Sequence, residues 1–115
     1  MNELDDCFAE YFTTIKSPEQ REIFRQILIQ TMLMLELNSY PEMDGGNPSF
    51  FLNDQPVIGF SANTEQIEII PQNIVALKTA VSWDHDFPFD HVKKLVKLRE
   101  AELLEDIEGV DRAED

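Results

Sequence analysis

Three acidic side chains near the start of the chain have the spacing that places them on one face of a helix. Glu3, Asp6 and Glu10 stand at positions i, i+3 and i+7. Carboxylate oxygens bind hard divalent cations, and at exposed sites they also bind Fe²⁺. The spacing therefore predicts a weak, labile metal site. The alternative is that these acids favour the positive end of the helix dipole and keep a solvated face charged.

A second candidate metal site is the run Asp84, His85 and Asp86, with His91 shortly after it. Carboxylate and imidazole groups in one loop can bind a divalent cation, although the spacing matches neither a zinc finger nor an HExxH motif. A turn rich in polar residues explains the same run without a metal. We place this site second to the acidic helix face.

The sequence contains no arrangement of residues typical of a catalytic site. Cys7 has Glu3 and Glu10 as expected neighbours on the helix surface, and negative charge raises the pKa of a thiol, so we expect a poor nucleophile. No phosphate-binding glycine loop or GxSxG motif is present. Four aromatic residues either line a ligand pocket or, as their strand spacing favours, fill the core: Phe50, Phe51, Phe60 and Trp83. We therefore do not expect an enzyme.

The charge balance narrows the class of partner. The 115 residues include 9 Lys and Arg against 23 Asp and Glu, a formal net charge of −14. Nucleic acids and anionic membranes are recognised by basic side chains, so neither is an expected partner. Cations and basic protein surfaces are favoured instead. A single cysteine, the absence of an apolar run of about 20 residues and an acidic N-terminus predict a cytoplasmic protein.

Helical periodicity marks the first third of the chain. Apolar residues recur at helical spacing over residues 3–16 and again over residues 18–37. Ser17 precedes Pro18 as an N-cap, and Gln20 completes a capping box. The apolar face of the second helix consists of Ile23, Phe24, Ile27, Leu28, Met32 and Leu35.

The middle of the chain changes to strand periodicity. Prolines and glycines predict a loop over residues 38–48. Residues 49–52, 57–61 and 66–70 are strand-like and are joined by short turns, which predicts an antiparallel meander. Helices on both sides of such a sheet in the sequence indicate an α+β fold.

The last third is expected to be helical again. Asn73 can cap a short helix that contains Ile74, Val75, Leu77 and Val81, and residues 81–83 can form a short edge strand. A final helix is expected from Phe89 to Ile107. Residues 1–107 then form a single domain, and residues 108–115 form an acidic, frayed tail.

Several short stretches occur in an order known from one family of small bacterial proteins. The stretches are Phe8-Ala9-Glu10-Tyr11-Phe12, Ser17-Pro18-Glu19-Gln20-Arg21, Asn47-Pro48-Ser49-Phe50, Val57-Ile58-Gly59-Phe60-Ser61, Ile67-Glu68-Ile69-Ile70-Pro71 and Val92-Lys93-Lys94-Leu95-Val96. In this order they resemble the YdhG-like proteins, also called DUF1801, a domain of unknown function. The resemblance covers roughly Leu4 to Leu104 and implies a curved antiparallel sheet flanked by N-terminal and C-terminal helices.

One branch of that family is described as a frataxin-like iron chaperone. Frataxin-like proteins hold iron weakly on an acidic ridge of the first helix, so the resemblance implies Fe²⁺ bound weakly by Glu3, Asp6 and Glu10, with iron-accepting proteins as partners. The alternative function is a metal-free protein-interaction module that binds a basic partner, with the acidic tail steering the encounter. The chain is expected to be a monomer or a homodimer.

Overall fold

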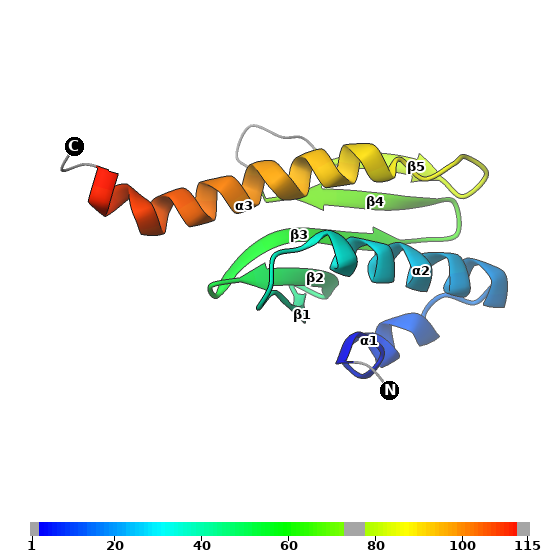
Figure 1. Ribbon diagram of the computed structural model, residues 1–115. Helices are drawn as coiled ribbons and strands as arrows, with labels where there is room; N and C mark the ends of the chain where they lie inside the picture. The colour runs from blue at the N-terminus through cyan, green and yellow to red at the C-terminus, as the bar shows by residue number, and fades with distance from the viewer. Residues whose placement is uncertain (1–2, 73–77, 113–115) are drawn as a thin grey trace.

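The computed structural model of the protein describes residues 3–72 and 78–112, with side chains as far as Leu104. Within these ranges, helices flank a five-stranded antiparallel meander in the order β1-β2-β3-β4-β5, which confirms the α+β class (Figure 1). The elements in chain order are α1 (Glu3–Thr13), α2 (Pro18–Met34), β1 (Tyr40–Asp44), β2 (Asn47–Leu52), β3 (Gln55–Ala62), β4 (Gln66–Pro71), β5 (Thr79–Ser82) and α3 (Phe89–Arg112).

One hydrophobic core joins the helices to the sheet. α1 packs against β1 and β2, α3 packs against β3 and β4, and α2 contacts both other helices. Phe60 and Ile69 pair across β3 and β4 and are fully buried, as expected for a sheet with one covered face. The helices contribute large side chains such as Phe8, Phe24 and Val92 to the same core. The last turns of α3 project beyond the sheet in Figure 1.

The connection between α1 and α2 forms where the sequence predicts it. The Ser17 hydroxyl accepts a hydrogen bond from the backbone amide three residues later at 3.2 Å, and Pro18 occupies the first turn of α2. α1 ends at Thr13, three residues earlier than predicted. The Arg21 guanidinium of α2 donates to the Ile15 carbonyl oxygen at 2.9 Å and thereby satisfies a backbone acceptor just after the helix end.

α2 also ends earlier than predicted, at Met34 rather than Leu37. Two side chains of α3 bind the backbone where α2 stops. Lys97 Nζ donates to the Met34 carbonyl oxygen at 2.9 Å, and Glu100 Oε2 accepts from the Glu36 amide at 2.7 Å. These long-range bonds replace the local bonds that would continue the helix, so the apolar period alone overestimated its length.

The prediction of a loop over residues 38–48 was wrong, because this segment forms β1 and the start of β2. Gly45 and Gly46 adopt φ values of +59° and +85° and make a two-residue hairpin turn. The residues that flank such a turn form a hydrogen-bonded pair and the pairs then alternate, which places Pro41 and Pro48 at non-hydrogen-bonded positions of the β1–β2 ladder. Neither proline therefore removes a bond from that ladder.

The other predicted strands are confirmed as β2, β3 and β4. Asn53 and Asp54 turn the chain between β2 and β3 with φ values of +53° and +63°, which these residue types tolerate. The short helix expected from Asn73 lies outside the described residues over positions 73–77. Val81, also assigned to that helix, belongs to β5, which agrees with the edge strand expected in this region.

α3 begins at Phe89 as predicted and continues to Arg112, five residues beyond the expected end at Ile107. The apolar period marks only the part of a helix that packs, whereas backbone hydrogen bonds can continue past it. The tail expected over residues 108–115 is thus helical as far as the structure describes it. None of the described helices has both the length and the apolarity to cross a lipid bilayer.

Candidate functional site

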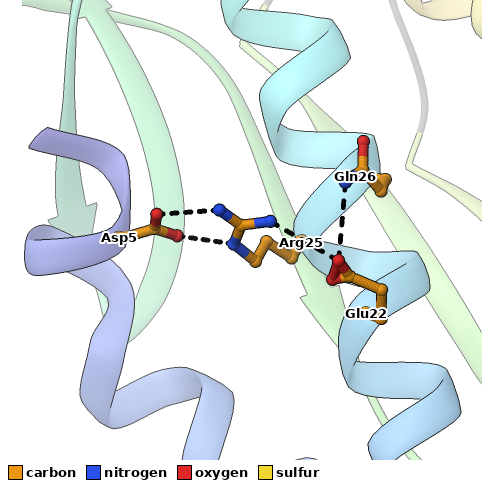
Figure 2. A network of polar contacts seen from close by, with 4 residues as sticks. All are labelled: Asp5, Glu22, Arg25 and Gln26. Carbon is orange, nitrogen blue, oxygen red and sulfur yellow. Dashed lines mark hydrogen bonds and ion pairs between the residues drawn. The ribbon is translucent and has the colours of Figure 1, made fainter. Parts of the chain in front are cut away.

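The acidic face predicted on α1 is exposed. Glu3, Asp6 and Glu10 all lie at the surface, and none of their side chains has a hydrogen bond or ion pair within the described part of the chain. Asp5, which the metal-site prediction omits, is the α1 acid with a defined contact. Its carboxylate faces Arg25 of α2, with an Nε–Oδ1 distance of 2.7 Å and an Nη2–Oδ2 distance of 2.9 Å (Figure 2). Hydrogen bonds from Arg25 hold the pKa of Asp5 below its usual value.

Neither predicted triad is brought together as a metal centre. Over residues 3–72 and 78–104, no three His, Cys, Asp or Glu side chains are grouped to hold a metal ion. Asp84, His85 and Asp86 are exposed in the turn between β5 and α3. The backbone amides of Asp84 and His85 bond to Ser82, which accounts for the turn itself. Weak cation binding by either triad stays a prediction.

Cys7 is half-buried on α1. Burial raises the pKa of its thiol, and the carboxylates of Glu42 and Glu3 raise it further, although a backbone hydrogen bond with Met43 opposes them. The carboxylates that act on the thiol are therefore those of Glu42, on β1, and Glu3, whereas the sequence predicted Glu3 and Glu10. Burial and these carboxylates favour the protonated thiol, which is the direction that the sequence predicted.

The four aromatic residues do not share one pocket. Phe50 and Phe60 are fully buried in the core. Phe51 stacks on Tyr40 with 5.7 Å between ring centroids, and Trp83 Nε1 donates to the Asn63 carbonyl oxygen at 2.7 Å. The core interpretation is correct for the two buried rings and for Trp83, which is partly buried and packs against the core, whereas Phe51 lies outside the core cluster.

The apolar feature that the sequence did not reveal is a groove between the first half of α2 and the segment that leads into α3. Its volume is about 450 Å³. Ile27 is nearly fully buried beneath it, while Ile23 remains 40% exposed. Phe87 and Phe89 form the opposite side, with their rings edge-to-face and 5.0 Å between centroids. We call this feature the α2 groove, lined by Glu19, Glu22, Ile23, Gln26, Ile27, Phe87 and Phe89.

Carboxylates border the α2 groove, and they differ in their contacts. Glu22 Oε1 lies 3.5 Å from Arg25 Nη1 and 3.5 Å from Gln26 Nε2, so it belongs to the network that begins at Asp5 (Figure 2). Glu19 is exposed and has no ion pair or side-chain hydrogen bond within the described part of the chain. The groove thus presents an apolar surface beside one engaged and one unengaged carboxylate.

A second hollow of about 380 Å³ lies between the α1–α2 connection and the β3–β4 turn. Three of its polar side chains make hydrogen bonds in local turns. Ser17 caps α2, Thr14 donates to the Tyr11 carbonyl oxygen, and Asn63 Oδ1 accepts from the two amides at the start of β4. Lys16, Gln20 and Thr64 also line this hollow, but nothing in their arrangement indicates a particular ligand.

Comparison with known proteins establishes the fold. No protein-family model matches the sequence, and no curated protein matches it. The structure is similar to the crystal structure of a DUF1801 family protein, YdhG from Bacillus subtilis, with a TM-score of 0.73 and 17% sequence identity. The similarity covers 88% of this chain and 92% of that chain. At this identity the two proteins share a fold, which confirms at that level the resemblance found in the sequence. The frataxin-like branch gains no support from it.

The sequence contained a signal for the α2 groove that periodicity alone does not interpret. The apolar stripe of α2 includes Ile23, which is 40% exposed and not part of the buried core. Phe87 and Phe89 stand on either side of a proline at the start of α3. Only the packing of α2 against the start of α3 shows that these residues meet.

Proposed function

We propose that this protein is a distant relative of the DUF1801 family and acts as a non-enzymatic module that binds a basic segment of a partner protein. The observation that supports this proposal is the α2 groove, an apolar surface bordered by carboxylates on a chain with a net charge of −14. Apolar contact contributes affinity, while the surrounding negative charge selects a basic partner and accelerates the encounter.

Charge disfavours the other classes of occupant. Phosphate backbones and anionic lipid headgroups are repelled by Glu19, Glu22 and the net charge of the chain. A second copy of the chain carries the same −14 charge, so its docking against this border brings like charges together. A segment with apolar side chains between Lys or Arg residues satisfies both the groove and its border.

Weak binding of Fe²⁺ or another divalent cation by Glu3, Asp6 and Glu10 is the second candidate function. It is supported by the exposure of all three carboxylates on one helix. A frataxin-like role adds the requirement for iron-accepting partners. We rank it second because the three side chains are not grouped as a metal centre.

The test is a titration of the protein with two fluorescent peptides that have the same leucines, one rich in lysine and one rich in glutamate. We expect the basic peptide to bind, the acidic peptide not to bind, and the affinity to fall when salt is raised to about 0.5 M. Ile23→Ser should weaken binding about fivefold, since an exposed isoleucine contributes roughly 1 kcal/mol when a partner covers it.

Leu33→Ser is the matched control. Leu33 is on the same helix, is 74% exposed and lies outside the groove lining. Leu33→Ser removes a large aliphatic side chain, as Ile23→Ser does, but leaves the α2 groove intact. The affinity of Leu33→Ser for the basic peptide should therefore equal that of the wild type. Equal losses in the two variants would show that binding does not use the groove.

A further inference from the structure

We infer that the occupant of the α2 groove is a short amphipathic helix of the partner, and that Glu19 is the residue that recognises its cationic side chain. This inference rests on the proposed function and specifies the geometry and charge of the partner. It follows from which backbone and side-chain groups of the groove are free.

The backbone around the α2 groove has no row of free donors and acceptors for an extended peptide. On one side Glu22 to Ile27 lie inside α2, where amides and carbonyls bond within the helix, and only the Glu19 amide belongs to the first turn, where amides lack an intrahelical acceptor. On the other side the Phe89 amide donates to the Phe87 carbonyl oxygen at 2.9 Å, and the Val92 amide donates to the Pro88 carbonyl oxygen at 3.1 Å. A strand docked here would leave its own backbone bonds unmade, whereas a helix satisfies them internally.

The length of the groove suits a helix of about two turns. Its lining on α2 runs from Glu19 to Ile27, which corresponds to about 12 Å along a helix axis. The groove residues of α2 recur at helical spacing and form one face. A partner helix with apolar side chains three and four positions apart would place them against Ile23 and the ring of Phe89.

The carboxylates of the border are not equivalent. Glu22 is close to the Arg25 guanidinium, and Arg25 in turn makes two hydrogen bonds with Asp5, so the negative charge of Glu22 already has a cationic neighbour (Figure 2). Glu19 lies one helical turn away with no such neighbour within the described residues. A lysine or arginine of the partner therefore gains more from Glu19 than from Glu22.

The experiment compares two lysine- and leucine-containing peptides of about 14 residues with identical composition, measured by fluorescence anisotropy. In one the leucines recur at helical spacing, and in the other they alternate with lysine as in a strand. We expect the helical peptide to bind the wild type at least about tenfold more tightly. Circular dichroism of that peptide should show helix formation on binding.

Charge variants test the role of Glu19. Glu19→Gln should weaken binding of the helical peptide about two- to fivefold. Glu22→Gln should match Glu65→Gln, which removes the same charge at an exposed turn outside the groove. Subtracting the effect of Glu65→Gln removes the contribution of net charge and leaves the local one.

The outcomes separate the inference from the proposed function. Equal affinity for the two peptides, with salt dependence and loss in Ile23→Ser, overturns the helical partner and keeps a basic one. Equal effects of Glu19→Gln and Glu22→Gln overturn the assignment of Glu19. If neither peptide binds, the proposed function itself is overturned. If sedimentation shows a dimer and Ile23→Ser dissociates it, a second copy of the chain occupies the groove. That outcome overturns both the helical partner and the proposed function.

Discussion

Replacing Glu100 with alanine tests whether a buried carboxylate holds the end of α2 against α3. The side chain is 2% exposed, and its Oε2 accepts from the Glu36 amide at 2.7 Å while its Oε1 lies 3.1 Å from Lys97 Nζ. A hydrogen bond to a charged group contributes about 1.5–3 kcal/mol, and its loss leaves the amide without a partner. The half-exposed Lys97 pair adds little. We expect a loss of about 2–3 kcal/mol in the free energy of unfolding.

Chemical denaturation with linear extrapolation measures this change, and thermal unfolding should show a Tm lower by roughly 10–20 °C. Glu100→Gln keeps an acceptor for the amide and should cost about 1 kcal/mol. The matched control is Glu102→Ala on the same helix. The Glu102 side chain is 40% exposed, and its Oε1 is buried without a hydrogen bond and lies 3.5 Å from Arg99 Nη1. This variant should cost no more than about 0.5 kcal/mol. If Glu100→Ala costs no more than Glu102→Ala, the carboxylate does not hold the helix end. If Glu100→Gln costs as much as Glu100→Ala, the ion pair with Lys97 rather than the amide bond carries the effect.

Three further predictions follow from contacts elsewhere in the molecule. Asp5→Asn should lower stability at neutral pH by less than Glu100→Ala, because it removes the ion pair with Arg25. The pKa of Asp5 is lowered on folding, so the wild type loses this stability as pH falls below about 3.8. The free energies of unfolding of the wild type and Asp5→Asn should therefore converge at that pH. A difference independent of pH would contradict the ion pair. Gly59→Ala should cost about 1–3 kcal/mol in a denaturation assay, because the new Cβ would lie 2.9 Å from Ser49 Oγ. Ser49→Ala should recover part of that loss, and no recovery would place the clash elsewhere. In anaerobic calorimetry, alanine at all three carboxylates of the predicted α1 site should abolish a specific Fe²⁺ response, whereas equal weak heats from Fe²⁺, Mg²⁺ and Ca²⁺ would indicate counterion attraction alone.

Features encoded by neighbouring residues were predictable from the sequence. The cap at Ser17 and the turn between β2 and β3 depend on residues within a few positions of one another. The α+β class follows from the change of apolar period along the chain. Local chemistry was sufficient for these features.

Features set by distant residues were not predictable in this way. The end of α2 depends on Lys97 and Glu100, which lie more than sixty residues later in the chain. The β1–β2 hairpin was a different failure, because its signal was local. Gly45 and Gly46 between two short strands are a strong turn signal, but Pro41 and Pro48 argued against strands until the register showed where they fall.

The predicted metal site on α1 also has one part that local spacing predicted and one part that depends on distant residues. Helical spacing correctly placed Glu3, Asp6 and Glu10 on the exposed surface of α1, yet spacing alone does not bring carboxylate oxygens to a common point. Asp5, between them in the sequence, pairs with Arg25, twenty residues away. An acidic helix face therefore combines residues that link helices with residues that remain solvated, and only the packing of α1 on α2 distinguishes the two.

The α2 groove arises from an apolar stripe that is wider than the core requires. Phe24, Ile27 and Leu28 belong to the buried core, whereas Ile23 lies outside it and remains 40% exposed. A single exposed isoleucine is ordinary on a protein surface, but Ile23 faces Phe87 and Phe89 across a continuous hollow. Phe87 and Phe89 also pack against the core, whereas folding gains less from the exposed part of Ile23, and that exposure favours unwanted association. The acidic border and the net charge of −14 counter that association between copies of the chain while leaving the groove open to a basic helix.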